Sequence, residues 1–142
     1  MIRKLQEPDL DKVADIWLTT NISAHSFIDA QYWYNNFQAV EKMLSQAEIY
    51  IYEDENKNKI QGFVGLNNDY IAGIFVRKEK QSNGIGKQLL DFIKNLHTKL
   101  TLNVYKKNTQ AIKFYHREGF KIKNENIDED VGEKEYEMIW ER

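Results

Sequence analysis

Cysteine is absent from the 142 residues, and proline occurs only once. Without thiols, the sequence excludes a disulfide scaffold, a cysteine nucleophile and a thiolate metal site. The three histidines, His25, His97 and His116, lack the spacing of metal ligands, so we expect no metal. No apolar run approaches the roughly 18 residues of a membrane span, and no apolar segment follows the charged residues at the start of the chain. We therefore expect a cytoplasmic protein with no membrane partner.

The composition is that of a folded globular protein. Hydrophobic residues make up 42% of the chain and charged residues 30%, which lies outside the range of disordered sequences. The length fits one domain, and the sequence contains no linker, internal repeat or low-complexity segment. We therefore predict a single domain over residues 1–142.

Positive charge is concentrated in one part of a chain whose net charge is only −2. Residues 77–123 hold twelve Lys or Arg against three acids, a balance of +9, whereas the rest of the chain has 8 − 19 = −11. Such a basic segment indicates either a region that meets an anion or solvated helix faces on which the charges fall unevenly. The acidic run 128–130 similarly indicates a solvated turn or a region that attracts a cationic acceptor.

Helical and strand periods alternate along the chain, which predicts a mixed α/β fold. Helices are expected from Pro8 to a break at 21–26, over 29–46, from about Gly84, and over 109–117. Strands are expected over 2–6, 48–53, 60–66, 70–76, 100–105, 120–123 and 135–140, with a polar turn at 54–58. The order is β-α-α-β-β-β-α-β-α-β-β. The strand over 70–76 is apolar without alternation, which indicates burial on both faces.

A basic loop with two glycines connects that apolar strand to the following helix. The free backbone N–H groups of a helix N-terminus bind phosphate, and glycines allow a close approach. The P-loop pattern fails because Lys87 is followed by Gln88, and the dinucleotide-binding pattern fails because residue 89 is leucine. Taken by itself, the loop fits a structural turn as well as a phosphate site.

Two motifs together resemble the GNAT family of acyl-CoA N-acyltransferases. Gln81, Gly84 and Gly86 match the pyrophosphate loop pattern Gln/Arg-x-x-Gly-x-Gly/Ala of that family. About 24 residues after Gly84, Asn108 opens a segment with Tyr115 and a final Gly-Phe pair, which is similar to the second family motif. The chain resembles the small single-domain bacterial members, the YjaB-like group. The resemblance implies a mixed central sheet of about six to seven strands flanked by about four helices.

The resemblance implies acetyl-CoA as cosubstrate and places its binding residues. The strand before the loop splays from its neighbour in this family, and the backbone of Ile74, Phe75 and Val76 would bind the pantetheine arm. Backbone amides of the loop would hold the pyrophosphate, at Gln81, Ser82, Asn83, Gly84, Ile85, Gly86 and Lys87. Ser82 departs from the family, which often has glycine there. Asn108 would contact the cofactor, and it also suits a plain helix N-cap.

For catalysis, the resemblance favours Tyr115 as the general acid that protonates the leaving thiolate, because a phenol keeps its proton at neutral pH. The sequence does not identify a general base. His25 is a candidate for this base and for the acceptor pocket, because its ordinary pKa near 6.5 suits a base and it lies where this family places acceptor-binding residues. Asp29 and Asp69 are weaker candidates for the base. Tyr70 and Asn103 either line the acceptor pocket or are ordinary sheet residues. His97 and His116 are expected to be structural.

We expect an N-acetyltransferase that acts on a primary amine of a small molecule or peptide by direct attack in a ternary complex. The alternative is a non-catalytic acyl-CoA-binding module with the same fold. No nucleic-acid recognition motif is found, so no nucleic-acid partner is expected, and the chain is expected to be a monomer or a homodimer.

Overall fold

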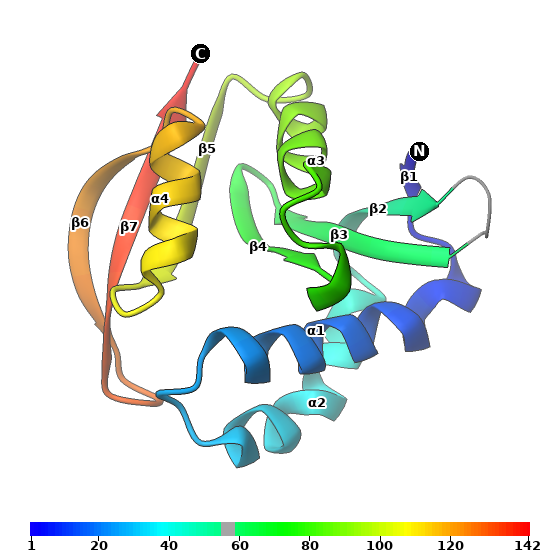
Figure 1. The fold of residues 1–142 in the computed structure, drawn as a ribbon, viewed down its shortest axis with the longest axis horizontal. Coiled ribbons are helices and arrows are strands. Elements are labelled where there is room, and N and C mark those ends of the chain that lie inside the picture. The colour runs from blue at the N-terminus through cyan, green and yellow to red at the C-terminus, as the bar shows by residue number, and fades with distance from the viewer. Residues whose placement is uncertain (55–58) are drawn as a thin grey trace.

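The computed structural model describes residues 1–54 and 59–142. Residues 55–58 of the expected polar turn lie outside the described residues. The described residues form one seven-stranded sheet and four α-helices (Figure 1). Setting two short 3₁₀ helices aside, the element order is the predicted one, which confirms the mixed α/β class.

The sheet is mixed, with the strand order β1-β2-β3-β4-β5-β7-β6. Its strands are β1 (Ile2–Lys4), β2 (Glu48–Asp54), β3 (Lys59–Asn67), β4 (Tyr70–Val76), β5 (Lys99–Tyr105), β6 (Lys121–Asp128) and β7 (Glu133–Glu141). Every neighbouring pair is antiparallel except β4 with β5, which is parallel. The last two strands are longer than predicted, because β6 continues beyond residue 123 to Asp128 and β7 begins at Glu133.

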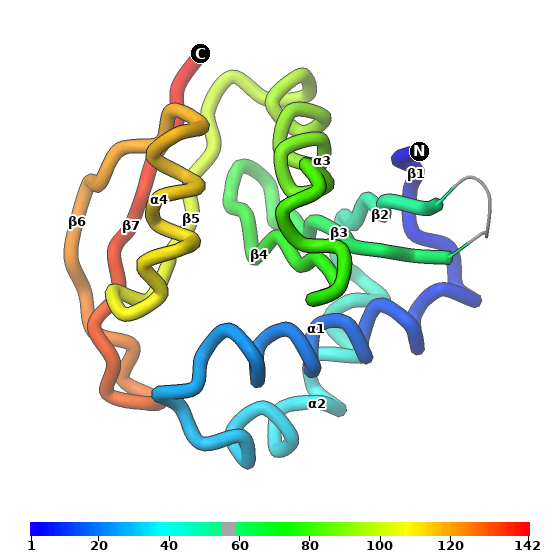
Figure 2. Tube along the Cα trace, viewed as in Figure 1, coloured from blue at the N-terminus to red at the C-terminus, as the bar shows by residue number. Residues whose placement is uncertain are grey.

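The parallel pair β4–β5 meets at one end only. Tyr70 pairs with Thr101 and Ile71 with Leu102, and beyond these positions the two strands diverge. The gap between their ribbons is visible in Figure 1 and again in Figure 2. From Ala72 to Val76 no residue of β4 is buried. The prediction that this strand is buried on both faces is therefore wrong beyond Ile71, because none of the described strands pairs with that edge of β4.

The four helices cover the sheet on both faces. They are α1 (Leu10–Ala24), α2 (Ala30–Leu44), α3 (Ile85–Lys94) and α4 (Thr109–Arg117). Apolar residues of α1 and α2 pack against β2 and β3 in one core cluster. Apolar residues of α3 and α4 pack against β2 to β5 and β7 in a second, larger cluster. Both clusters consist mainly of the apolar positions that the sequence periods predict.

Helix α1 continues through the predicted break and ends at Ala24. Two polar residues in this stretch are buried because they bond to the preceding helical turn. The Thr20 hydroxyl donates to the Ile16 carbonyl at 2.6 Å, and the Asn21 side-chain amide donates to the Trp17 carbonyl at 2.8 Å. Polar side chains that hydrogen-bond to the carbonyls of the preceding turn can remain within a helix, so the prediction of a break at residue 21 is wrong. The longer helix carries the chain as far as His25.

Candidate functional site

A cavity of about 1130 Å³ opens where β4 and β5 separate. It is lined by the end of α1, by β4, by the glycine loop, by β5, by α4 and by residues of β6 and β7. The predicted catalytic, cofactor-binding and acceptor-pocket residues all line it except Asn83. The Asn83 side chain instead donates to the Lys80 carbonyl at 3.1 Å, so it shapes the loop. The structure thus brings together two motifs that are separated in sequence by a helix and a strand.

The glycine loop takes its shape from two residues with left-handed backbone. Ser82 has a φ of 67° and Gly84 a φ of 81°, just before α3 begins. Left-handed backbone favours glycine, which explains why glycine suits position 82 and shows that this chain accepts serine there. The Gln81 side chain donates to the Val76 carbonyl at 3.0 Å and so fastens the loop to the end of β4. The first amides of α3 are left free of helical partners and lie at the cavity.

The basic residues around the cavity differ in how their charge is compensated. Lys87 forms ion pairs with Asp91 at 2.9 Å and Glu118 at 3.4 Å, so its charge is already balanced within the protein. Lys80 and Lys113 also line the cavity and have no ion-pair partner among residues 1–54 and 59–142. The basic segment therefore provides uncompensated positive charge at the cavity, as an anionic ligand requires.

Tyr115 lies on α4 and is only 8% exposed. Its ring packs edge-on against Phe120, with centroids 5.5 Å apart, and its side chain lines the cavity. Burial, and secondarily the neighbouring Tyr70 phenol, raises the pKa of Tyr115 above its usual value. Its hydroxyl has no hydrogen-bond partner in the described parts of the chain. The side chain is therefore a protonated donor, free to bond with a ligand.

Tyr70 and Asn103 face the cavity from the two strands that diverge. Tyr70 begins β4, and Asn103 lies in β5 two positions beyond Thr101, the partner of Tyr70. Burial and the charge of Glu135 raise the pKa of Tyr70, and hydrogen bonding with Asn103 opposes the rise. The two candidate acceptor residues therefore contact each other beside Tyr115.

His25 sits in an aromatic cage at the end of α1. Its ring stacks on Trp33 at 5.5 Å and meets Phe27 and Tyr105 edge-on. Burial lowers the pKa of His25 from 6.5 to about 4. Asn108 caps α4 by accepting from the Ala111 amide at 3.2 Å, so its amide nitrogen is the donor that lies 3.2 Å from His25 Nε2.

This arrangement makes His25 a poor general base. Its Nε2 accepts from Asn108, and its Nδ1 is buried without a partner in the described residues. A substrate in the cavity therefore finds neither ring nitrogen available, because one is bonded to Asn108 and the other is buried. The contact nevertheless joins α1 to the second sequence motif across 83 positions of the chain.

The two weaker candidates for the base lie outside the cavity. Asp29 caps α2 by accepting from the Gln31 amide at 2.9 Å. Asp69 pairs with His97 at 3.0 Å. Both carboxylates have structural partners, and neither stands near Tyr115 in the cavity lining.

Sequence reasoning missed two cavity residues at the end of the sheet, Tyr105 and Glu135, and indicated Asp128 only as part of the acidic run 128–130. The Tyr105 hydroxyl donates to the Asp128 carboxylate at 2.7 Å, and burial raises the pKa of Tyr105. Burial and the nearby Asp128 charge also raise the pKa of Glu135. The only signal in the sequence was the acidic run 128–130, because charged residues in the final strands look like an ordinary exposed face.

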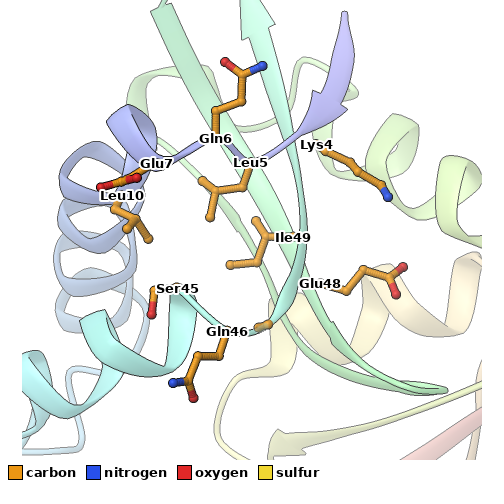
Figure 3. A pocket seen from close by; sticks show the side chains of 10 residues that line it. Lys4, Leu5, Gln6, Glu7, Leu10, Ser45, Gln46, Glu48 and Ile49 are labelled. Atoms are coloured by element: carbon orange, nitrogen blue, oxygen red, sulfur yellow. The ribbon is translucent and has the colours of Figure 1, made fainter.

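A second cavity, of about 640 Å³, lies between the β1–α1 connection and the α2–β2 connection (Figure 3). Its lining includes Leu5, Leu10 and Ile49, with polar residues at its edges. None of the sequence-predicted site residues lines it. The chemistry is therefore concentrated at the β4–β5 opening.

Two general properties of the described residues complete the picture. Within residues 1–54 and 59–142, no group of three or more His, Cys, Asp or Glu side chains is placed to hold a metal ion. No helix in these parts of the chain has the length and apolar character needed to cross a bilayer.

This chain is similar in sequence and in fold to known acetyltransferases. Residues 45–122 match the family described as the acetyltransferase (GNAT) domain. The peptidyl-lysine N-acetyltransferase YiaC of Escherichia coli is 35% identical over 124 residues, which cover 86% of this chain and 84% of YiaC. The solution structure of apo YjaB from Escherichia coli superimposes with a TM-score of 0.87 at 22% identity, covering 99% of this chain and 96% of YjaB.

A Bacillus anthracis acetyltransferase solved in complex with acetyl coenzyme A is 26% identical, with a TM-score of 0.60, and the match covers 68% of this chain and 62% of that one. The sequence match, which takes in the glycine loop and the segment that follows it, and the agreement in fold lead to one conclusion. The chain belongs to the GNAT acetyltransferase family.

Proposed function

We propose that this protein transfers an acetyl group from acetyl-CoA to the side-chain amine of a lysine in a peptide or protein of the cytoplasm. The observation that carries the proposal is the cavity in which the glycine loop, the free edge of β4 and Tyr115 meet. Membership of the GNAT family supports the transfer reaction. The peptidyl-lysine activity of the relative YiaC supports the acceptor class.

The loop and the free strand edge would bind the two ends of the cosubstrate. The free amides at the start of α3, with Lys80 and Lys113 nearby, suit the pyrophosphate of acetyl-CoA. The backbone edge of Ile74–Val76, which β5 does not cover, suits the amide groups of the pantetheine arm, which would bond to it as a neighbouring strand does, although the Val76 carbonyl already accepts from Gln81. The cavity would then place the thioester between this edge and Tyr115.

Transfer follows as a direct attack in the ternary complex. The neutral amine attacks the thioester carbonyl, and backbone N–H groups of β4 stabilise the developing oxyanion. When the carbon–sulfur bond breaks, the thiolate takes a proton from the Tyr115 hydroxyl, and the proton lost by the amine restores the phenol through solvent. Burial raises the pKa of Tyr115, and the same burial raises the pKa of a thiol in the cavity, so proton transfer between them stays feasible.

The test separates cosubstrate binding from chemistry. Calorimetry should give micromolar binding of acetyl-CoA, and thiol release should occur with a blocked lysine tripeptide. The Tyr115→Phe variant should lose about 10²–10⁴-fold in kcat and bind acetyl-CoA as the wild type does. Tyr34→Phe, at an exposed position of α2, is the matched control. A wild-type protein that does not bind acetyl-CoA would refute the proposal.

The second candidate is a module that binds acyl-CoA without catalysis. It predicts the same calorimetric result and no thiol release with any amine. The free, buried hydroxyl of Tyr115 at the cavity favours the enzyme, because a pure binding module has no need of a proton donor at that point.

A further inference from the structure

Glu135 stands apart from the other carboxylates of the β6–β7 hairpin. In the part of the chain that the structure describes, it has no hydrogen-bond or ion-pair partner. Its neighbours are each held by a side chain of the protein: Glu125 by Lys106 at 3.0 Å, Glu133 by Lys107 at 3.2 Å, and Glu137 by Asn124 at 2.8 Å. Glu129 and Glu141 also lack such a partner, but both are exposed to solvent, so among the described acids of the hairpin Glu135 is the one that is partly buried without a partner.

The position of Glu135 is inside the cavity of the proposed active site. It lies on β7 opposite Tyr105 of β5, and it lines the cavity together with Tyr70 and Tyr115. Its charge acts on both Tyr70 and Tyr105, raising the pKa of each phenol. Glu135 therefore faces the space where the acceptor must approach the proton donor.

A partly buried carboxylate without a partner is costly to the free protein. Moving a charge away from water is unfavourable unless an opposite charge or hydrogen-bond donors replace the lost hydration. Nearby Asp128 does not relieve the cost, because it is itself an acid and its carboxylate already accepts from Tyr105. A ligand that brings positive charge to Glu135 would remove this penalty on binding.

We propose that Glu135 binds the ammonium group of the acceptor lysine and is the residue that selects cationic acceptors. This inference rests on the proposed function and deepens it, because it names the group that the cavity recognises. A compact ammonium with three N–H donors fits one carboxylate flanked by the hydroxyl of Tyr70. Glu135 is a positioning and specificity residue here: it docks the ammonium form, which releases one proton to solvent before the neutral amine attacks, and Tyr115 remains the residue that acts on the leaving thiolate.

The first experiment measures acceptor kinetics in a Glu135→Gln variant with the tripeptide acetyl-Ala-Lys-Ala-amide. Loss of one charge-assisted hydrogen bond predicts a KM for the peptide raised by about 10–100-fold, a kcat changed less than about threefold, and an unchanged Kd for acetyl-CoA. Glu125→Gln removes the same charge from the same hairpin outside the cavity and is the matched control. An equal rise in KM in both variants would show a long-range charge effect and overturn the proposal.

The second experiment does not depend on turnover. The CoA complex is titrated with n-butylammonium, and binding is followed by the fluorescence of Trp17 and Trp33, which line the cavity. The wild type should bind the cation and Glu135→Gln should bind it about 10-fold or more weakly. Equal binding in the two proteins, or none in the wild type, refutes the role of Glu135. A wild type that binds butylammonium but acetylates no lysine peptide refutes the proposed function and leaves the cation site standing.

Discussion

Acid should destabilise this protein through His25, well above the pH at which carboxylates begin to titrate. In the folded protein His25 is caged by aromatic rings and its pKa falls to about 4. In the unfolded chain the pKa returns to about 6.5. Between these two pKa values His25 is protonated in the unfolded chain and neutral in the folded protein, so lowering the pH shifts the equilibrium toward unfolding.

The magnitude follows from the size of this shift. Each pH unit inside the window costs about 1.4 kcal/mol of folding free energy. The contribution is complete above about pH 6.5 and is lost progressively as the pH falls, so a change from pH 7 to pH 5 should remove about 2 kcal/mol. Carboxylates contribute little in this range, because the unfolded-state pKa values of Asp and Glu lie near 4.

Urea unfolding at pH 7, 6 and 5 measures this loss in the wild type and in His25→Gln. The substitution itself changes packing at every pH, so the informative quantity is how the difference between the two proteins varies with pH. It should move by about 2 kcal/mol in favour of the variant between pH 7 and pH 5. His116→Gln, which alters a histidine at the surface near Phe120, is the control. If the difference in unfolding free energy between wild type and His25→Gln does not change with pH, the conclusion that His25 is buried and neutral in the folded protein is refuted.

Four further substitutions test the site's framework, each by urea unfolding. Gly84→Ala should destabilise by about 1 kcal/mol or more, because its φ of 81° strains a side chain. Gly86→Ala, where an added Cβ meets only ordinary contacts of 3.6 Å, should be neutral or stabilise by up to about 1 kcal/mol; the same sign at both glycines would contradict this. Asn108→Ala should cost about 1 kcal/mol through the lost α4 cap. Gly62→Ala should cost about 1–3 kcal/mol, since its Cβ would lie 2.7 Å from the Phe75 carbonyl, and an unchanged stability would show that β4 yields easily.

The sequence predicted those parts of the site that local patterns encode. The structural roles of Gly84 and Asn108 can be predicted from the sequence, because a turn and a helix cap each depend on a few neighbouring residues. The order of helices and strands can be predicted for the same reason, because the spacing of hydrophobic residues that distinguishes a helix from a strand is visible within a short segment. Their agreement with the structure extends to the two core clusters, where the predicted apolar faces meet.

The parts that the sequence did not predict depend on contacts between distant segments. The exposure of β4 follows from the position of β5 about thirty residues later, and an apolar strand looks the same whether or not a neighbour covers it. The isolation of Glu135 is visible only after the partners of the other hairpin acids are known. Likewise, the contact of His25 with Asn108 joins residues that are 83 positions apart in the chain.

The narrow junction between β4 and β5 also bears on how the chain reaches its native state. On one side of it, β1 to β4 pair antiparallel in sequence order; on the other, β7 pairs antiparallel with both β5 and β6. Only two residue pairs link these two sets of strands within the sheet, and the other connections are the core beneath α3 and a few side-chain contacts such as that of His25 with Asn108. Each set can therefore gain most of its contacts as a cooperative unit before the two dock. In native-state hydrogen exchange, the two sets of strands should open with two distinct free energies. A ligand that spans the junction should reduce the difference between these two opening free energies.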